Sequence, residues 1–214
     1  MLSNALICIF IGYILGLFQT SFIIGKIIKK DLRLLGSGNL GATNAMRNFG
    51  KTLGAVTYFF DALKGFIAAL IVLFIFKNRI DVRVALQVCA MFGAILGHCF
   101  PFYLKFKGGK GVSTLTGAMV CINPLIGLLG LIIFFSSLYI TRYVSVSSLI
   151  MSFSYFAMIS ISSAFGFFIA DQKSVIIITL MSGIVFCLIV YMHRSNLYRL
   201  AANNERKVGT QNDA

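Results

Sequence analysis

The chain has 214 residues, of which 58% are hydrophobic and 12% charged, and its mean hydropathy is +0.91. Soluble domains contain roughly 45–50% apolar and about 25% charged residues, so a soluble globule is excluded, and the continuous apolar runs exclude a transmembrane barrel, whose strands alternate. In such a chain the formal net charge of +13 indicates basic cytoplasmic loops and contact with anionic lipid or substrate, and we expect no nucleic-acid partner.

Six segments are apolar enough to cross the hydrocarbon core, which takes about 20 helical residues. They lie at 4–25, 52–76, 84–103, 125–140, 146–169 and 174–192. A further apolar segment, 112–122, covers only part of the bilayer and is followed by Asn123-Pro124, a pair that favours a turn. The chain, 1–214, is therefore predicted to be one integral membrane domain, an all-α polytopic helix bundle.

The Asn123-Pro124 pair allows two topologies. If 112–140 is one kinked span, the chain crosses six times and its basic residues divide 10 to 8; if the pair is an external turn, the chain crosses seven times and fourteen of the 19 Lys and Arg fall on one side against four on the other. The positive-inside rule favours seven crossings, one of them short, with the N-terminus outside and the C-terminus in the cytoplasm. Because lysines follow the first apolar segment and none precedes it, we predict a retained span, not a signal peptide.

The first polar segment on the predicted cytoplasmic side, 36–47, reads GSGNLGATNAMR. Its first six residues match the GxGxxG dinucleotide pattern, but no strand precedes them, so a nucleotide site is not predicted. Glycines allow a ligand to approach the backbone closely, and Thr43, Asn44 and Arg47 gather at the start of the following helix, where anions bind. An anion site competes here with a membrane-adjacent turn whose arginine sets topology.

The second polar segment, 106–114, reads FKGGKGVST. It is not a Walker A loop, because Gly111 stands where that motif needs Ser or Thr. Three glycines interleaved with two lysines before a helix start are typical of a backbone-amide phosphate nest. A flexible basic loop on anionic lipid would explain the lysines but not the glycines, so a phosphate site is favoured.

Two more polar segments, 142–148 and 193–205, read RYVSVSS and HRSNLYRLAANNE. In the first, Ser145 is explained by a helix cap and the arginine by topology anchoring. In the second, His193 and Asn196 share one helix face at i, i+3. A histidine at the end of a span is usually a solvated boundary residue, so the interest of His193 depends on the other segments.

Three polar residues fall inside predicted spans. Asp61 and Lys64, at i, i+3, are expected to neutralise each other, although ionisable residues within a membrane are often functional. His98 is predicted to be a structural hydrogen-bonding group, because no second ligand is spaced to share a metal with it, and we predict no metal site and no cofactor. The cysteines, without any CxxC pair, are predicted to be buried hydrophobes: Cys8, Cys89, Cys99, Cys121 and Cys187.

Together these segments resemble the bacterial acyl-phosphate:glycerol-3-phosphate acyltransferases of the inner membrane. That family carries three cytoplasmic motifs, and this chain matches them with GSGNLGATNAMR at 36–47, GHCFPFYLKFKGGKGVST at 97–114 and HRSNLYRLAANNE at 193–205. The RYVS turn at 142–145 is similar as well, so the resemblance covers nearly the whole chain. The one mild departure is Asn203-Asn204, where the family often has glycine.

The resemblance implies an enzyme that transfers a fatty acyl group from acyl phosphate to the 1-hydroxyl of sn-glycerol 3-phosphate. The products are lysophosphatidic acid and phosphate, the first acylation of phospholipid synthesis. It also implies a multi-pass protein of the bacterial inner membrane with its active site facing the cytoplasm, and with acyl phosphate, glycerol 3-phosphate and the lipid bilayer as partners. Two glycine-rich basic loops suit two phosphorylated substrates.

The resemblance further implies roles for individual residues. The phosphate of glycerol 3-phosphate is assigned to Lys107, Gly108, Gly109 and Gly111. The acyl phosphate is assigned to Ser37, Asn39, Thr43 and Arg47. Orientation of the acceptor is assigned to His193 and Asn196, with Ser145 as a further donor, and Glu205 is expected to be structural, paired with a basic loop. Which loop takes which phosphate stays open.

Two other functions fit the composition. A transporter for a small phosphorylated anion would need midplane broken helices or internal repeats, which the sequence does not show, and a non-catalytic scaffold leaves the glycine loops unexplained. If the chain is an acyltransferase, it works without a His-x4-Asp pair, because Tyr103 and Tyr198 occupy the fifth positions after the two histidines. No serine has a recognisable histidine and carboxylate around it either, so we predict direct acyl transfer without an acyl-enzyme.

Overall fold

The computed structural model describes residues 1–209, and every regular element among them is helical. The α-helices are α1 (Leu2–Gly16), α2 (Thr20–Ile27), α3 (Ala42–Phe49), α4 (Lys51–Ile75), α5 (Arg83–Cys99), α6 (Val112–Ile122), α7 (Pro124–Thr141), α8 (Val144–Ala164), α9 (Gln172–Met192) and α10 (Arg194–Ala201), with 3-10 turns η1 (Leu32–Leu34) and η2 (Phe102–Leu104). Six helical segments, α1 with α2 counted as one, are long and apolar enough to cross a membrane, and α6 is a shorter apolar helix. The predicted all-α polytopic bundle is confirmed.

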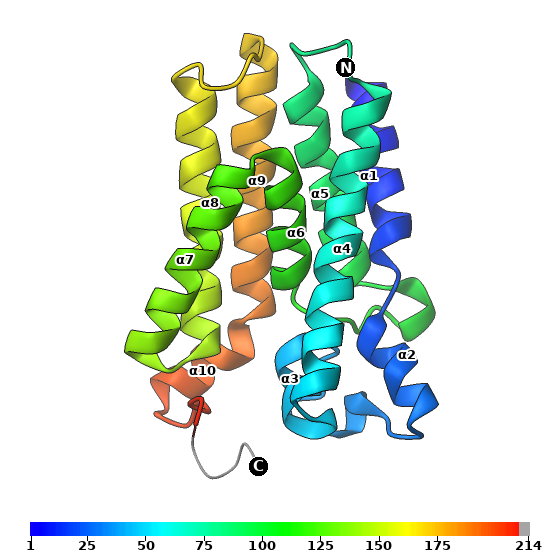
Figure 1. The fold of residues 1–214 in the computed structure, drawn as a ribbon, viewed down its shortest axis with the longest axis vertical. Helices are drawn as coiled ribbons and strands as arrows, with labels where there is room; N and C mark the ends of the chain where they lie inside the picture. The colour runs from blue at the N-terminus through cyan, green and yellow to red at the C-terminus, as the bar shows by residue number, and fades with distance from the viewer. Residues whose placement is uncertain (210–214) are drawn as a thin grey trace.

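The long helices run along the long axis of the molecule in two groups (Figure 1). One group contains α1, α4 and α5, the other contains α7, α8 and α9, and α6 lies between them against α4, α5 and α7. In the span that contains α5, 83% of the apolar stretch is buried inside the protein, whereas in α7 the buried share is 17%. The core therefore centres on α5, and α7 presents most of its apolar surface to its surroundings, as a lipid-facing helix does.

The short helix α6 and the helix α7 form a hairpin. Asn123 caps α7, its side-chain oxygen accepting a hydrogen bond from the Ile126 N–H at 3.1 Å, and Pro124 takes the first helical position. In Figure 1, α6 turns into α7 before it reaches the upper end of the bundle, and α7 returns to the lower end. The connections α4–α5 and α8–α9 consequently lie at the end opposite to α2, α3 and α10. The chain therefore alternates as in the seven-segment topology, and a single kinked helix over 112–140 is wrong.

The first span differs from the continuous helix expected over 4–25. The structure ends α1 at Gly16 and begins α2 at Thr20. The expectation of one uninterrupted span is wrong here, because an apolar run conceals a short irregular segment. Before the break, α1 lies close against α5 through two glycine pairs spaced by four residues: Gly12 and Gly16 face the backbone of Ala90 and Ala94, while Gly93 and Gly97 face that of Ile9 and Tyr13.

The cysteines divide into two groups. Cys8, Cys89 and Cys99 are buried as expected, but Cys121 is half-buried and Cys187 is exposed on the outside of α9. Cys187 is exposed because only 22% of the apolar stretch of α9 is buried inside the protein, so an apolar position on this helix faces the surroundings as readily as the core. All five are free thiols.

Candidate active site

The three sequence motifs meet at one end of the bundle, where Figure 1 places α3, α10 and the connection between α5 and α6. Asn39 Nδ2 donates to the Gly108 carbonyl at 3.4 Å, joining the first motif to the second. Lys110 Nζ donates to Asn196 Oδ1, joining the second motif to the third. Segments that are remote in sequence thus form one polar cluster.

Asn44 organises the first motif. Its Nδ2 donates to the carbonyls of Leu35 at 3.0 Å and Asn39 at 2.9 Å, and its Oδ1 accepts from the Ser37 N–H at 3.1 Å and from Asn48 Nδ2 at 3.0 Å. A buried amide whose hydrogen bonds are all made to the protein shapes the loop instead of binding a ligand. The expectation that Asn44 helps to bind an anion is therefore corrected.

Other polar groups of the first motif lie around the start of α3. Gly41 precedes this helix without a side-chain cap, so no capping side chain accepts from the first N–H groups of α3, which have no intrahelical acceptor. Thr43 and Arg47 are half-buried on α3, and Ser37 is exposed on the preceding loop. The arrangement offers backbone amides, hydroxyls and a guanidinium to an anion.

The glycines of the second motif have a different role from the one expected. The N–H groups of Gly108 and Gly109 donate inward, to the carbonyls of Cys99 and His98, each at 3.0 Å. A Cβ on residue 109 would overlap the His98 ring. This corrects the expectation that these two amides form the phosphate nest: they permit close packing of the loop on the end of α5.

The backbone N–H groups of this motif that could face an anion lie slightly further along the chain. Gly111 has φ +83° and begins α6, which has no side-chain cap. The N–H groups of residues 111–114 are those that a helix leaves without intrahelical acceptors, and such groups suit an anion. The left-handed backbone at Gly111 favours glycine there.

Lys110, which received no role from the sequence, is the lysine that reaches the third motif. It is half-buried and contacts Asn196, whereas Lys107 is exposed. The sequence signal for Lys110 is its place immediately before the first turn of a helix, but two lysines three positions apart in a glycine-rich loop cannot be ranked without knowing where the loop turns.

The electrostatic surroundings of Lys110 place it among other charges of the site. Burial lowers the pKa of Lys110 to about 8, Glu205 opposes this shift, and the positive charges of Arg199 and Arg47 add to it. Arg47 of the first motif therefore lies within electrostatic reach of Lys110 of the second. An anion between them would relieve the repulsion of the two cations.

His193 is buried at the end of α9, with its Nδ1 2.8 Å from the Ile189 carbonyl. Because a carbonyl only accepts hydrogen bonds, Nδ1 carries the proton and Nε2 is left as an acceptor. Burial and the nearby Lys110 lower the pKa of His193 to about 4, against smaller opposite effects of Ile189 and Glu205. At neutral pH this imidazole is uncharged and suited to accept a hydrogen bond from a hydroxyl group.

Glu205 connects the third motif to the turn between α7 and α8. Its carboxylate accepts from Ser145 Oγ at 3.0 Å, Asn196 Nδ2 at 2.7 Å and Arg199 Nε at 2.7 Å. Burial alone would raise the pKa of Glu205, but these hydrogen bonds outweigh it and hold the pKa below its ordinary value. Ser145, expected as a substrate donor, is thus bound to Glu205, and Glu205 itself pairs with Arg199 of α10 instead of with a glycine loop.

The family model described as glycerol-3-phosphate acyltransferase matches residues 6–203. The chain belongs to the glycerol-3-phosphate acyltransferase family. Glycerol-3-phosphate acyltransferases of Staphylococcus saprophyticus and Clostridioides difficile are 36% and 37% identical to it, over 94% and 95% of this chain and 96% and 95% of theirs.

Two solved structures are similar along their whole length. They are crystal structures of PlsY, an integral membrane glycerol 3-phosphate acyltransferase, in a glycerol 3-phosphate form and a lysophosphatidic acid form. The TM-scores are 0.84 and 0.82 at 34% and 32% identity, covering 96% and 98% of this chain and 96% and 97% of theirs. The structural similarity therefore extends over the broken first span and the short α6 and is not confined to the motifs.

Proposed function

We propose that this glycerol-3-phosphate acyltransferase uses acyl phosphate as donor and transfers its acyl group to the 1-hydroxyl of sn-glycerol 3-phosphate. The observation that carries the proposal is the convergence of Arg47, Lys110 and two uncapped helix N-termini, those of α3 and α6, at one end of the bundle. Each N-terminus offers unpaired N–H groups to an anion, and two phosphorylated substrates need two such sites. Membership of the family supports acyl transfer to glycerol 3-phosphate over transport of a phosphorylated anion.

The two anion sites would hold the reactants beside each other. Residues 111–114 with Lys110 would take one phosphate, and the start of α3 with Ser37, Thr43 and Arg47 would take the other. Lys107, exposed at the rim of the loop, would attract anionic substrates, and Asn39 would keep the two loops together through the Gly108 carbonyl. The acyl chain would remain in the bilayer beside the helices.

In the transfer itself, the hydroxyl oxygen of the acceptor attacks the acyl carbonyl carbon, and the bond from that carbon to the phosphate oxygen breaks. His193 Nε2 would accept the hydrogen bond of the attacking hydroxyl and so orient it. With a pKa of about 4, His193 is a weak base, and a phosphate oxygen, whose second pKa is about 6 in phosphorylated side chains, is the better proton acceptor. Positioning and neutralisation of the phosphates would supply most of the rate.

No covalent intermediate is included in this mechanism. In residues 1–209, no serine or cysteine hydrogen-bonds a histidine, and Ser145 is bonded to Glu205. An acyl phosphate is an activated anhydride with a good leaving group, so a protein nucleophile is unnecessary.

The end of the bundle that carries the motifs would face the cytoplasm of a bacterium, in its inner membrane. Fourteen of the basic residues lie in segments at this end, as the positive-inside rule requires. Single cysteines at Ser195 and at Arg79, on a cysteine-free background, test the orientation with a membrane-impermeant maleimide applied to whole cells. Position 79 should label and position 195 should not; the reverse pattern would invert the topology.

The donor is tested with purified protein in detergent. Glycerol 3-phosphate is incubated with palmitoyl phosphate or with palmitoyl-CoA, and lysophosphatidic acid is measured by mass spectrometry. Product formed only from palmitoyl phosphate supports the proposal. Product formed only from palmitoyl-CoA would replace the donor, and no product from either, with glycerol 3-phosphate binding absent, would remove the proposed function.

A further inference from the structure

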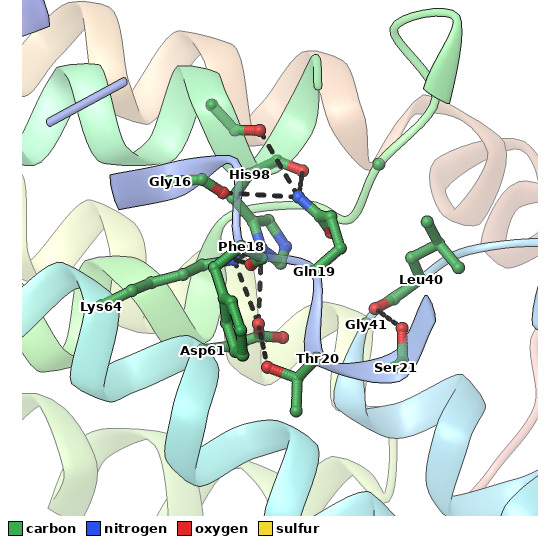
Figure 2. Close-up of polar contacts among 12 residues, drawn as sticks. Gly16, Phe18, Gln19, Thr20, Ser21, Leu40, Gly41, Asp61, Lys64 and His98 are labelled. Carbon is green, nitrogen blue, oxygen red and sulfur yellow. Dashed lines mark hydrogen bonds and ion pairs between the residues drawn. The ribbon is translucent and has the colours of Figure 1, made fainter. Parts of the chain in front are cut away.

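The break between α1 and α2 lies over a buried polar cluster (Figure 2). A broken helix inside a membrane leaves carbonyls that need other partners. Here three successive carbonyls are hydrogen-bonded by side chains: Gly16 by Gln19 Nε2 at 3.4 Å, Leu17 by the Tyr103 hydroxyl at 2.6 Å and Phe18 by Lys64 Nζ at 2.5 Å. The break is therefore a built feature, held by side chains from α4 and from η2.

Lys64 has all of its donors engaged. An ammonium group carries three N–H donors and no acceptor. Its Nζ lies 2.5 Å from the Phe18 carbonyl, 3.1 Å from Asp61 Oδ1 and 2.8 Å from His98 Nδ1. His98 Nδ1 must then be an acceptor, so the imidazole proton sits on Nε2, at the edge of the ring that Gly109 covers.

His98 also contacts the glycine loop of the second motif. Its carbonyl accepts from the Gly109 N–H at 3.0 Å and from Gln19 Nε2 at 3.0 Å, and the adjacent Cys99 carbonyl accepts from Gly108. One residue of α5 thus touches the broken span, Lys64 and the glycine loop at once. Figure 2 shows His98 between Lys64 and Gln19, with Asp61 hydrogen-bonded to Thr20 at 3.1 Å.

We propose that Asp61, Lys64 and His98 form a buried strut, a hydrogen-bonded connection that fixes the loop 105–111 relative to the broken first span. The strut holds Lys110 and the start of α6 at the distance that a substrate phosphate requires. Lys64 is a positioning residue that does not touch substrate. The kinetic part of this inference rests on the proposed function. A pair that served only to neutralise charge would need neither the Phe18 carbonyl nor the His98 ring, yet Lys64 binds both.

The experiment separates positioning from neutralisation. Removing only one partner of a buried pair is strongly destabilising, because it leaves the other charge unpaired. The double variant Asp61→Asn/Lys64→Gln avoids this, because it removes both charges. Arg79→Gln, which removes an exposed pair with Asp81 at the other end of the bundle, is the matched control. Both are made with Cys99 as the sole cysteine, because Cys99 is buried beneath residues 108 and 111 and becomes a reporter of loop opening. Maleimide labelling of Cys99 is measured in detergent beside KM and kcat.

If the strut positions the loop, the double variant should purify in normal yield but label at Cys99 about ten-fold faster or more. Its KM for glycerol 3-phosphate should rise about 10- to 100-fold, the range that a misplacement of about 1 Å produces, while Arg79→Gln stays at wild-type values. Wild-type labelling and wild-type KM in the double variant would overturn the proposal and leave a neutralising pair.

Two further arms keep the test decisive. If the double variant does not fold, His98→Gln replaces it, since this variant keeps the charge pair and removes the ring beneath Gly109; the same increase in labelling supports the strut and wild-type labelling overturns it. If wild-type protein fails to acylate glycerol 3-phosphate, the proposed function falls, while Cys99 labelling still decides whether Asp61, Lys64 and His98 hold the loop.

Discussion

Lys110 donates a hydrogen bond to the side-chain oxygen of Asn196, a residue 86 positions later in the chain. Because an amide is neutral, this contact fixes the ammonium group without cancelling its charge. The nearby carboxylate of Glu205 is instead hydrogen-bonded to Asn196 itself and to Arg199. The second and third motifs are thus joined while Lys110 keeps its positive charge.

The two lysines of the second motif should differ in their contribution to catalysis. Lys110→Gln removes a half-buried cation at the start of α6 and should lower kcat/KM about 10²- to 10³-fold, as loss of one preorganised electrostatic group does. Lys107→Gln, its matched control on the exposed side of the loop, should cost about ten-fold or less through weaker attraction of anions. A Lys107 variant worse than the Lys110 variant would show that the loop binds phosphate in another register.

Arg47→Lys should be far from conservative. Lysine keeps the charge but loses the planar, bidentate donors that match phosphate oxygens. We expect kcat/KM to fall about 100-fold or more while the protein inserts and purifies normally, which would be checked by membrane yield and steady-state kinetics. Near wild-type activity would place the first phosphate away from α3.

Gly109→Ala should damage the second motif through packing, because the added Cβ would overlap the His98 ring. Gly183→Ala is the control, since a Cβ there meets Phe156 at 3.4 Å, an ordinary contact. We expect the first variant to show a higher KM for glycerol 3-phosphate and faster Cys99 labelling, and the second to show neither. An unchanged Gly109 variant would mean that the loop does not rest on His98.

The pH dependence of kcat/KM should report Lys110 and not His193. Lys110, with a pKa of about 8, is protonated below that pH and loses its charge above it, so kcat/KM should fall above about pH 8. His193, with a pKa of about 4, stays neutral through the physiological range and should add no acidic limb. A limb near pH 6 that persists in His193→Gln belongs to the substrate phosphate; one that vanishes in that variant would contradict the neutral imidazole.

Acyl transfer should form no covalent acyl adduct on the protein. A variant with all five cysteines replaced should remain active, and intact mass after incubation with acyl phosphate alone should show no acyl adduct. Cys99 is the cysteine that lies within a motif, and it is buried; Cys8 and Cys89 are buried as well, Cys121 is half-buried and Cys187 is exposed on α9. A stoichiometric adduct that glycerol 3-phosphate discharges would establish an acyl-enzyme.

The sequence by itself determined the class of the protein, its apolar spans and the three motifs that meet at one end of the bundle. Hydropathy and helix length are local properties, so the apolar segments and the short α6 followed directly, and charge counting selected seven helical segments over six because α7 had to return the chain to the basic end. The three motifs also contain the polar residues that meet at one end of the bundle, because polar, glycine-rich segments stand out in an otherwise apolar chain.

Tertiary structure alone decided which of these groups face the site. Whether Gly108 and Gly109 turn their amides inward, and whether Lys110 or Lys107 reaches Asn196, depends on how the loop folds onto α5, and composition does not encode this. The break in the first span was invisible for the same physical reason: its carbonyls are hydrogen-bonded by Gln19, Tyr103 and Lys64, and two of these donors lie far away in the sequence. Sequence spacing explained Asp61 and Lys64 as a self-neutralising pair. Only the folded chain brings Lys64 into contact with His98, and through it with the glycine loop.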